Sequence, residues 1–181
     1  MAGSLIKVDE FTISSPVASV ILGGGSSGSS GLNASIDSTY DVYMVRFNNV
    51  NASADSELYF RVTKSGTADT TANYDYADKV LNAVGFSNRG ITNDTKTVLE
   101  TTSTTANNET ANAIFYLFNF NSSSEYSFYT YEQSNRNQSG QLSAPTGGGV
   151  HTVASASDGV QFSLNANNFT SGTFTLYGLK K

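Results

Sequence analysis

Long stretches of the chain alternate between apolar and polar positions with a period of two, which is typical of β-strands. The strongest stretch, residues 113–132, predicts a β-hairpin with a polar turn at 121–124. The first strand of this hairpin is apolar on both faces, as is typical of a strand in the middle of a packed sheet. We expect the hairpin to form the centre of the fold.

Further strands follow from the same alternation. Residues 40–50 and 57–63 each predict a strand that presents three large apolar side chains on one face. Residues 173–179 alternate strictly, so we expect this last strand to be paired inside a sheet. Residues 74–84 are the one candidate helix, because apolar side chains recur there every four residues.

The connecting segments are rich in Gly, Ser and Asn. Residues 85–95 are rich in turn-forming residues, and residues 23–31 and 134–149 predict long loops with glycine runs. About ten strands with such connections predict an all-β fold. We expect one antiparallel β-sandwich domain over residues 1–181, in the jelly-roll version, with at most one short helix.

Composition limits the partners. Only 14% of residues are charged, the net charge is −5, and the ten Lys and Arg residues are scattered, so nucleic acid is not an expected partner. Nothing approaches the roughly 18 apolar residues of a membrane span. Lys7, Asp9 and Glu10 lie where a secretory signal needs an apolar core, so synthesis in a cytoplasm and release by lysis or assembly are expected.

Candidate chemistry is sparse. The chain has no cysteine, and its single histidine, His151, has no Gly-x-Ser-x-Gly motif to accompany it, so we expect it to be a packing or surface residue. A calcium site from Asp69, Asp75 and Asp78 is conceivable, but the segment lacks an Asp-x-Asp-x-Asp-Gly loop. No metal or cofactor is therefore expected.

Catalysis by paired carboxylates is the enzymatic alternative. A glycoside hydrolase would need two of Asp41, Glu125 and Glu132 to flank one bond. Acidic residues are few and there is no tryptophan to line a sugar subsite. We therefore expect a protein that is not an enzyme.

Tyrosines are the most informative surface candidates. In the second strand of the hairpin, Tyr126 and Phe128 share one face and Tyr129 and Tyr131 share the other. We expect Tyr59, Tyr129 and Tyr131 to point outward. A tyrosine offers a large contact area with a polar tip, which suits an interface or a sugar platform. The alternative is that these rings pack against the long loops.

Eight segments carry a family resemblance: Ile13–Val20, Tyr40–Tyr43, Tyr59–Thr63, Leu117–Asn121, Glu125–Phe128, Gly148–Val150, Asp158–Val160 and Ser171–Gly178. These segments are distributed over most of the chain and resemble small proteins of marine tailed bacteriophages, including those of cyanobacterial hosts. They contain no catalytic signature. What the resemblance implies is a structural protein of the virion.

Two roles on the virion are open. The first is a capsid decoration or cement protein on the outside of the head, which bridges subunits of the major capsid protein and clusters with copies of itself, with a trimer expected. The second is a tail-associated adhesin or fibre-tip module that binds host surface glycan.

Overall fold

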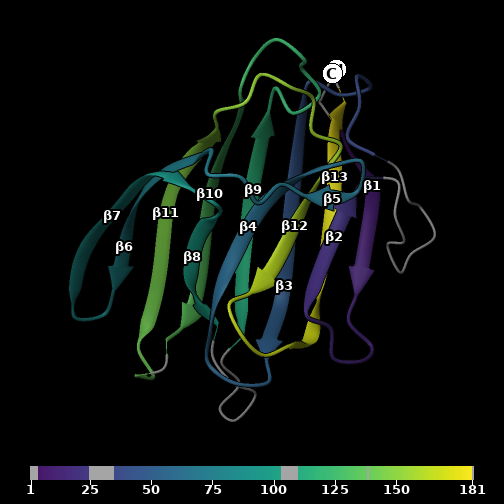
Figure 1. Cartoon of the computed structure of the whole chain (residues 1–181). Helices are drawn as coiled ribbons and strands as arrows, with labels where there is room; N and C mark the ends of the chain where they lie inside the picture. Colours follow the sequence, from purple (N-terminus) through teal and green to yellow (C-terminus); the bar gives the residue numbers. More distant parts are fainter. Residues whose placement is uncertain (1–3, 25–34, 103–109, 138, 181) are drawn as a thin grey trace.

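The computed structural model describes residues 4–180, except 25–34, 103–109 and 138. These residues form thirteen β-strands in two antiparallel sheets that pack as a sandwich (Figure 1). The predicted antiparallel β-sandwich is therefore confirmed, with more strands than the ten expected. The described ranges contain no helix, and so none in them is long and apolar enough to cross a membrane.

The two sheets differ in size. From one edge to the other, the larger sheet contains β1 (Ser4–Thr12), β13 (Phe169–Lys180), β3 (Val42–Ala52), β9 (Ala111–Phe118), β10 (Ser127–Arg136), β11 (Leu142–His151), β6 (Tyr74–Asn82) and β7 (Gly85–Asp94). The smaller sheet contains β2 (Ser19–Gly23), β12 (Gly159–Leu164), β4 (Ser56–Lys64) and β5 (Thr67–Ala68), and β8 (Thr97–Thr102) also pairs with β4.

The strand order is that of a jelly roll. Four strands of the larger sheet follow the order β1-β13-β3-β9, in which the first strand of the chain pairs with the last. Four strands of the smaller sheet follow the order β2-β12-β4-β8, since β8 pairs with β4. The remaining strands are insertions in this frame. Of these, β10, β11, β6 and β7 extend the larger sheet past β9, and β6 and β7 form its far end on the left of Figure 1.

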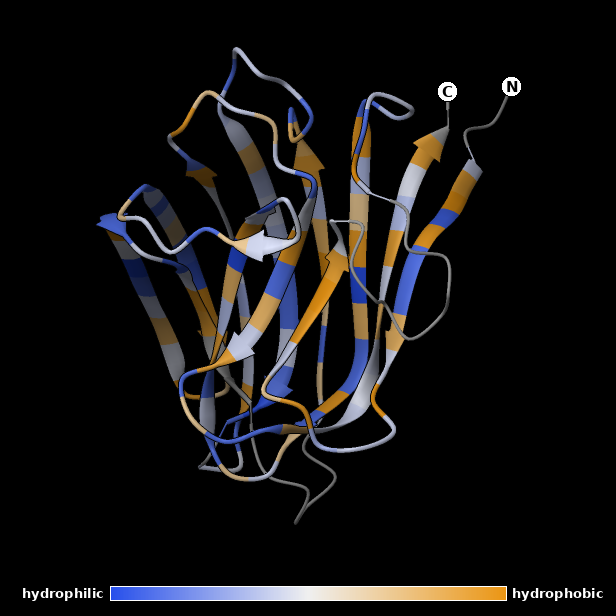
Figure 2. Ribbon diagram, turned by 45° about the vertical axis from the view of Figure 1, so that its right-hand side comes forward, coloured by the Kyte–Doolittle hydropathy of each residue, from blue (hydrophilic) through white to orange (hydrophobic). Residues whose placement is uncertain are grey.

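The sheets meet over an aromatic core. The Phe115 ring of β9 lies 5.4 Å, centroid to centroid, from the rings of Phe60, Phe162 and Tyr131. All four side chains are buried, because each strand directs every second residue toward the opposite sheet. Figure 2 shows the resulting hydrophilic and hydrophobic bands along the strands.

The main sequence-predicted strands have the expected positions. β9 lies in the middle of the larger sheet, between β3 and β10, and β13 is paired on both sides, by β1 and β3. The predicted inward residues of β4, Leu58, Phe60 and Val62, are fully buried. The expectation that β9 is packed on both faces is wrong for the described chain, since Ile114 and Tyr116 are exposed on its outer face.

The candidate helix at 74–84 is instead strand β6 followed by a two-residue turn into β7. Its apolar residues at positions 76, 80 and 84 are four apart, and positions four apart also share one face of a strand. Val80 faces the interior, whereas Leu81 lies on the opposite face and is exposed. The segment expected to consist of turns, 85–95, is for the most part strand β7.

The predicted loop at 134–149 is also wrong, because β10 continues to Arg136 and β11 begins at Leu142. Gly140 lies in the turn between these strands with a φ of 71°, but Gly147 and Gly149 serve close packing instead. A Cβ atom on Gly147 would collide with Asp78 and the Ala77 carbonyl, and one on Gly149 would collide with the Tyr129 side chain. In the other predicted loop, 23–31, residues 25–31 lie outside the described residues.

Candidate functional site

The outer face of the larger sheet, which points away from the smaller sheet, carries side chains in rows across the strands. Strand register aligns a central row: Tyr116, Thr130, Gly148, Ala77 and Gly90, from β9 to β7. A row beside it, which we call the polar row, contains Glu132, Thr146, Lys79 and Asn88 and ends at the apolar Ile114. An apolar row on the other side contains Phe118, Phe128 and Val150.

The central row forms the floor of a shallow groove. Gly148, Ala77 and Gly90 have little or no side chain, so their neighbours in the flanking rows stand above them. Two depressions of about 430 and 550 Å³ meet at β11, beside Gly147 and Gly148. Four strand spacings of about 4.8 Å make the row roughly 19 Å long. We call this feature the outer groove.

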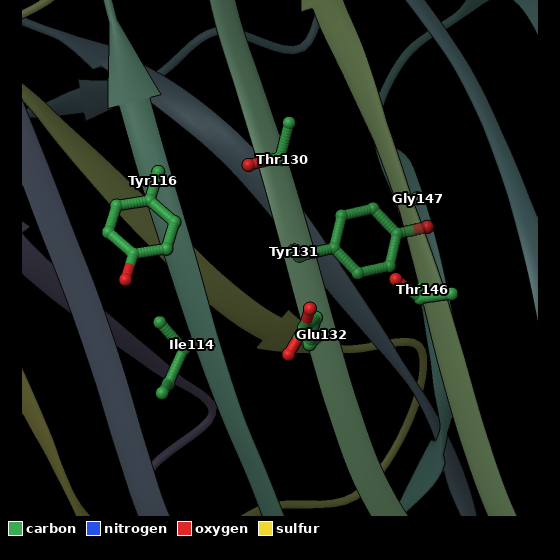
Figure 3. Close-up of a pocket in the computed structure, with 7 residues that line it drawn as sticks. All are labelled: Ile114, Tyr116, Thr130, Tyr131, Glu132, Thr146 and Gly147. Atoms are coloured by element: carbon green, nitrogen blue, oxygen red, sulfur yellow. The ribbon is translucent and has the colours of Figure 1, made fainter.

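The best-defined end of the outer groove lies over β9, β10 and β11. Figure 3 shows Tyr116 and Ile114 on β9, Thr130 and Glu132 on β10, and Thr146 on β11, with the Tyr131 ring extending toward Gly147. The groove thus combines a phenol ring, two hydroxyl groups and one carboxylate. Farther along it, the Lys79 Nζ lies 5.1 Å from the centre of the Phe86 ring. Such a mixture can hold a polar chain through ring stacking and hydrogen bonds.

The structure corrects two of the three predicted surface tyrosines. Tyr129 and Tyr131 point into the sandwich and are buried, because Phe128, Thr130 and Glu132 occupy the outer face of β10. Tyr129 shares a hydrogen bond with the Thr97 hydroxyl, and Tyr131 Oη donates to Asp78 Oδ2 over 2.5 Å. Burial raises the pKa of both phenols. The expectation that these two side chains point outward is therefore wrong.

Tyr59 is half-buried on β4, in the smaller sheet. Its hydroxyl donates to Glu57 over 2.9 Å, and its ring lies within 5.6 Å of the Arg61 guanidinium and 5.0 Å of the Lys96 ammonium. Burial and the Glu57 carboxylate raise the pKa of Tyr59 to about 12. Since Tyr59 belongs to the other sheet, it is no part of the outer groove.

The three aspartates considered for calcium do not converge. Asp69 contacts Lys64 and Thr71, Asp75 accepts a hydrogen bond from the Asn93 amide, and Asp78 binds Arg89. Asp75 and Asp78 lie on opposite faces of β6. Among the residues that the structure describes, no three His, Asp or Glu side chains are grouped so that they could hold a metal ion.

The three candidate carboxylates are all exposed. Glu132 lies in the polar row, Glu125 in the turn before β10, and Asp41 just before β3. Strand register places Asp41 two strands away from Glu132, because β9 lies between β3 and β10, and five residue positions away along the strand direction. That is roughly 19 Å between backbones, beyond the carboxyl separation of about 5–9.5 Å in glycosidases.

His151 ends β11 and is completely buried, so the interpretation as a packing residue agrees with its position. Its ring lies 4.9 Å from the Tyr74 ring, and its Nε2 lies 3.3 Å from Asp69 Oδ2. Burial lowers the pKa of His151, and the Asp69 carboxylate offsets this only in part. Burial opposes ionisation of Asp69, but Thr71 and Lys64 outweigh it and lower the pKa of Asp69 to about 2.

This burial predicts a pH dependence of stability. An unfolded histidine titrates near pH 6.5, whereas folded His151 binds its proton only at lower pH. The unfolded chain therefore binds more protons as the pH falls below about 6.5, and we expect the free energy of unfolding to fall from there down to the folded pKa. Ionised Asp69 contributes to the free energy of unfolding at every pH above its unfolded pKa near 3.8, and this contribution is lost only as the pH falls toward 2.

Urea unfolding at pH 7 and at pH 5 measures this effect, with His151→Gln as the matched variant. We expect the wild type to lose more stability than the variant between these pH values. Equal losses would assign the pH dependence to other groups.

Sequence reasoning missed Tyr116 and Phe128 as surface residues, although it placed both on apolar faces. Alternation shows which side chains of a strand share a face, but it does not show which of the two faces is buried against the other sheet. The glycine run at 147–149 was a usable signal of close packing, but its alignment with Ala77 and Gly90 depends on pairings between distant segments.

No known family model, curated protein or solved structure matches this chain, so its function has to be inferred from its own fold and surface.

Proposed function

We propose that this chain is a non-enzymatic structural protein of a tailed-bacteriophage virion, which decorates the capsid exterior and docks on the major capsid protein. The outer face of the larger sheet would be the docking surface. One observation carries this proposal: Ile114, Tyr116 and Phe128 are 38%, 40% and 47% exposed on two adjacent strands at the centre of that sheet.

The character of this face supports contact with another protein. Large apolar side chains gathered in one place on a soluble surface mark interaction sites, and aromatic residues are enriched in protein interfaces. Polar residues such as Arg46 and Glu132 lie beside the aromatic ones and would form a polar rim. The phage context rests on the sequence resemblance.

Location and copy number test the proposal in the particle. We expect the chain on the head surface, in a copy number comparable with that of the major capsid protein. A reconstruction of the virion together with quantitative mass spectrometry measures both. A few copies per virion would reject the decoration role.

Substitutions test the docking surface. We expect the double variant Tyr116→Ser/Phe128→Ser to bind undecorated capsids at least about tenfold more weakly, because interface aromatics each contribute more than about 1 kcal/mol when buried. Tyr59→Ser makes the same kind of change on the other sheet and should bind normally. Loss of binding in Tyr59→Ser but not in the double variant would place the interface on the smaller sheet.

A tail-associated adhesin that binds host glycan is the second candidate, and the outer groove is the observation that favours it. A groove of roughly 19 Å could hold an extended oligosaccharide across the strands. Tyr116 would stack on a sugar ring, and Thr130, Thr146 and Glu132 would bind its hydroxyl groups. Glycan-array binding that Tyr116→Ser abolishes, with normal capsid attachment and a position at the tail, would favour this role over decoration.

A further inference from the structure

We propose that β7 is a self-association site, at which it pairs antiparallel with β7 of a second copy of this chain. The two eight-stranded sheets would join edge to edge around a twofold axis. This inference rests on the exposed edge of the sheet and does not depend on the virion role.

β7 ends the larger sheet and, within the described residues, pairs on one side only, with β6. Its register with β6 is uninterrupted from Gly85 to Ile91 and shifts only beyond that point. Almost all of its side chains are exposed on both faces, and Phe86 is 72% exposed. A long edge strand with free backbone groups is a template for pairing with another strand.

The opposite edge of the same sheet is protected. In β1 the register with β13 shifts between Lys7 and Asp9, which marks a β-bulge. The Asp9 side chain is buried and accepts a hydrogen bond from the Gly23 amide over 2.9 Å. Bulges and inward-pointing charges are devices that prevent edge-to-edge pairing. Between Gly85 and Ile91, β7 has neither a bulge nor proline nor lysine.

The one charged residue in that part of β7 is directed away from the edge. The Arg89 side chain points to the inner face of the sheet, where its Nε and Nη2 donate to the Asp78 carboxylate over 2.9 and 2.5 Å. Its positive charge is thereby paired within the chain. A second β7 could approach the edge without meeting an unpaired charge.

The register determines which backbone groups are free. Antiparallel neighbours alternate between hydrogen-bonded and non-hydrogen-bonded pairs. The Ala83 amide, just after β6, donates to the Leu142 carbonyl of β11. In this register the odd-numbered residues of β6 direct their backbone N–H and C=O groups toward β11, and the even-numbered residues direct theirs toward β7. In β7, therefore, Phe86, Asn88 and Gly90 oppose odd-numbered residues and direct their N–H and C=O groups away from β6.

These three residues define a self-complementary register. With Asn88 opposite Asn88 of the second copy, each Phe86 lies across from Gly90 of the other copy, so that the ring can cover the glycine. On the other face, Ser87 would lie across from Arg89. No like charges are opposed, which favours this pairing. Such a contact is twofold and produces a dimer, in contrast to the trimer expected from the sequence.

Sedimentation of the full chain over a range of concentrations tests the proposal. We expect a concentration-dependent dimer for the wild type and a monomer for Asn88→Pro, because proline removes an outward N–H that β6 does not use. Asn88→Ala keeps this N–H and should still form the dimer. A wild type that stays monomeric at every concentration would overturn the proposal, and the edge would then be open to pairing with a strand of another protein. A trimer that persists in Asn88→Pro would overturn it as well.

Cross-linking provides a second test that does not depend on the proline variant. The chain has no cysteine, so Asn88→Cys introduces the only thiol. Facing residues of a hydrogen-bonded pair have Cα atoms about 5.5 Å apart, within disulfide range. We expect mild oxidation to give a covalent dimer, whereas Leu5→Cys on the exposed part of β1 should stay monomeric. Equal cross-linking of the two variants would overturn the proposed interface.

Discussion

Phe115→Ala is expected to lower the free energy of unfolding by about 4 kcal/mol, the cost of deleting a large aromatic side chain from a packed core. Phe115 has no exposed surface and lies at the centre of the sandwich. Its ring stacks on Phe60 of the smaller sheet and on Tyr131 of its own sheet, and it meets Phe162 edge-on. The variant loses contacts to both sheets and leaves a cavity between them. Urea unfolding measures the loss.

Tyr116→Ala is the matched control for this prediction. The two residues are neighbours on β9, but Tyr116 is exposed on the outer face. We expect Tyr116→Ala to cost less than about 1 kcal/mol, because a half-exposed side chain away from the core leaves no cavity. Comparable losses in both variants would mean that the outer face is packed, which would contradict its assignment as a docking surface.

Asp78→Ala is expected to destabilise the protein by about 3 kcal/mol, since the variant loses a buried carboxylate that accepts three hydrogen bonds, and hydrogen bonds to a charged group contribute about 1.5–3 kcal/mol. The Asp78 carboxylate is completely buried and accepts three hydrogen bonds, two from Arg89 and one from Tyr131. Without it, Arg89 and the Tyr131 hydroxyl both lose the carboxylate that accepts these hydrogen bonds. Because Arg89 belongs to β7, the loss should also loosen the end of the larger sheet.

Asp75→Ala provides the comparison on the same strand. Asp75 lies on the opposite face of β6 and accepts one hydrogen bond, from the exposed Asn93 amide. Its removal should cost no more than about 1 kcal/mol. Faster hydrogen exchange of β6 and β7 amides in Asp78→Ala, but not in Asp75→Ala, would confirm the role of Asp78. An Asp78→Ala protein as stable as the wild type would show that the ion pair contributes no net stability.

Local sequence patterns predicted most of the architecture. Strict alternation in β4 and β13, and the doubly apolar β9, located strands that are paired on both sides within the two sheets. About ten predicted strands with connections rich in Gly, Ser and Asn pointed to a sandwich. These predictions succeed because each depends only on which side chains share a face within one strand.

The candidate site could not be predicted in the same way. Tyr129 and Tyr131 were expected to face outward, but alternation shows only that they share a face of β10 and does not show which face is covered. They are buried because Thr97 and Asp78, from two other strands, satisfy their hydroxyl groups inside the sandwich. The helical period in β6 was misleading since a spacing of four suits a helix and a strand alike.

The sequence by itself determined that this chain is an antiparallel β-sandwich, which strands lie at its centre and which side chains share a face. Only the tertiary structure decided which face of β9 and β10 is buried, where the outer groove runs and which edge strand of the larger sheet stays open to pairing among the described residues. The physical reason is that alternation is a property of one strand. Burial, grooves and edges arise from the register of strands that are distant in the chain, such as β11 beside β6.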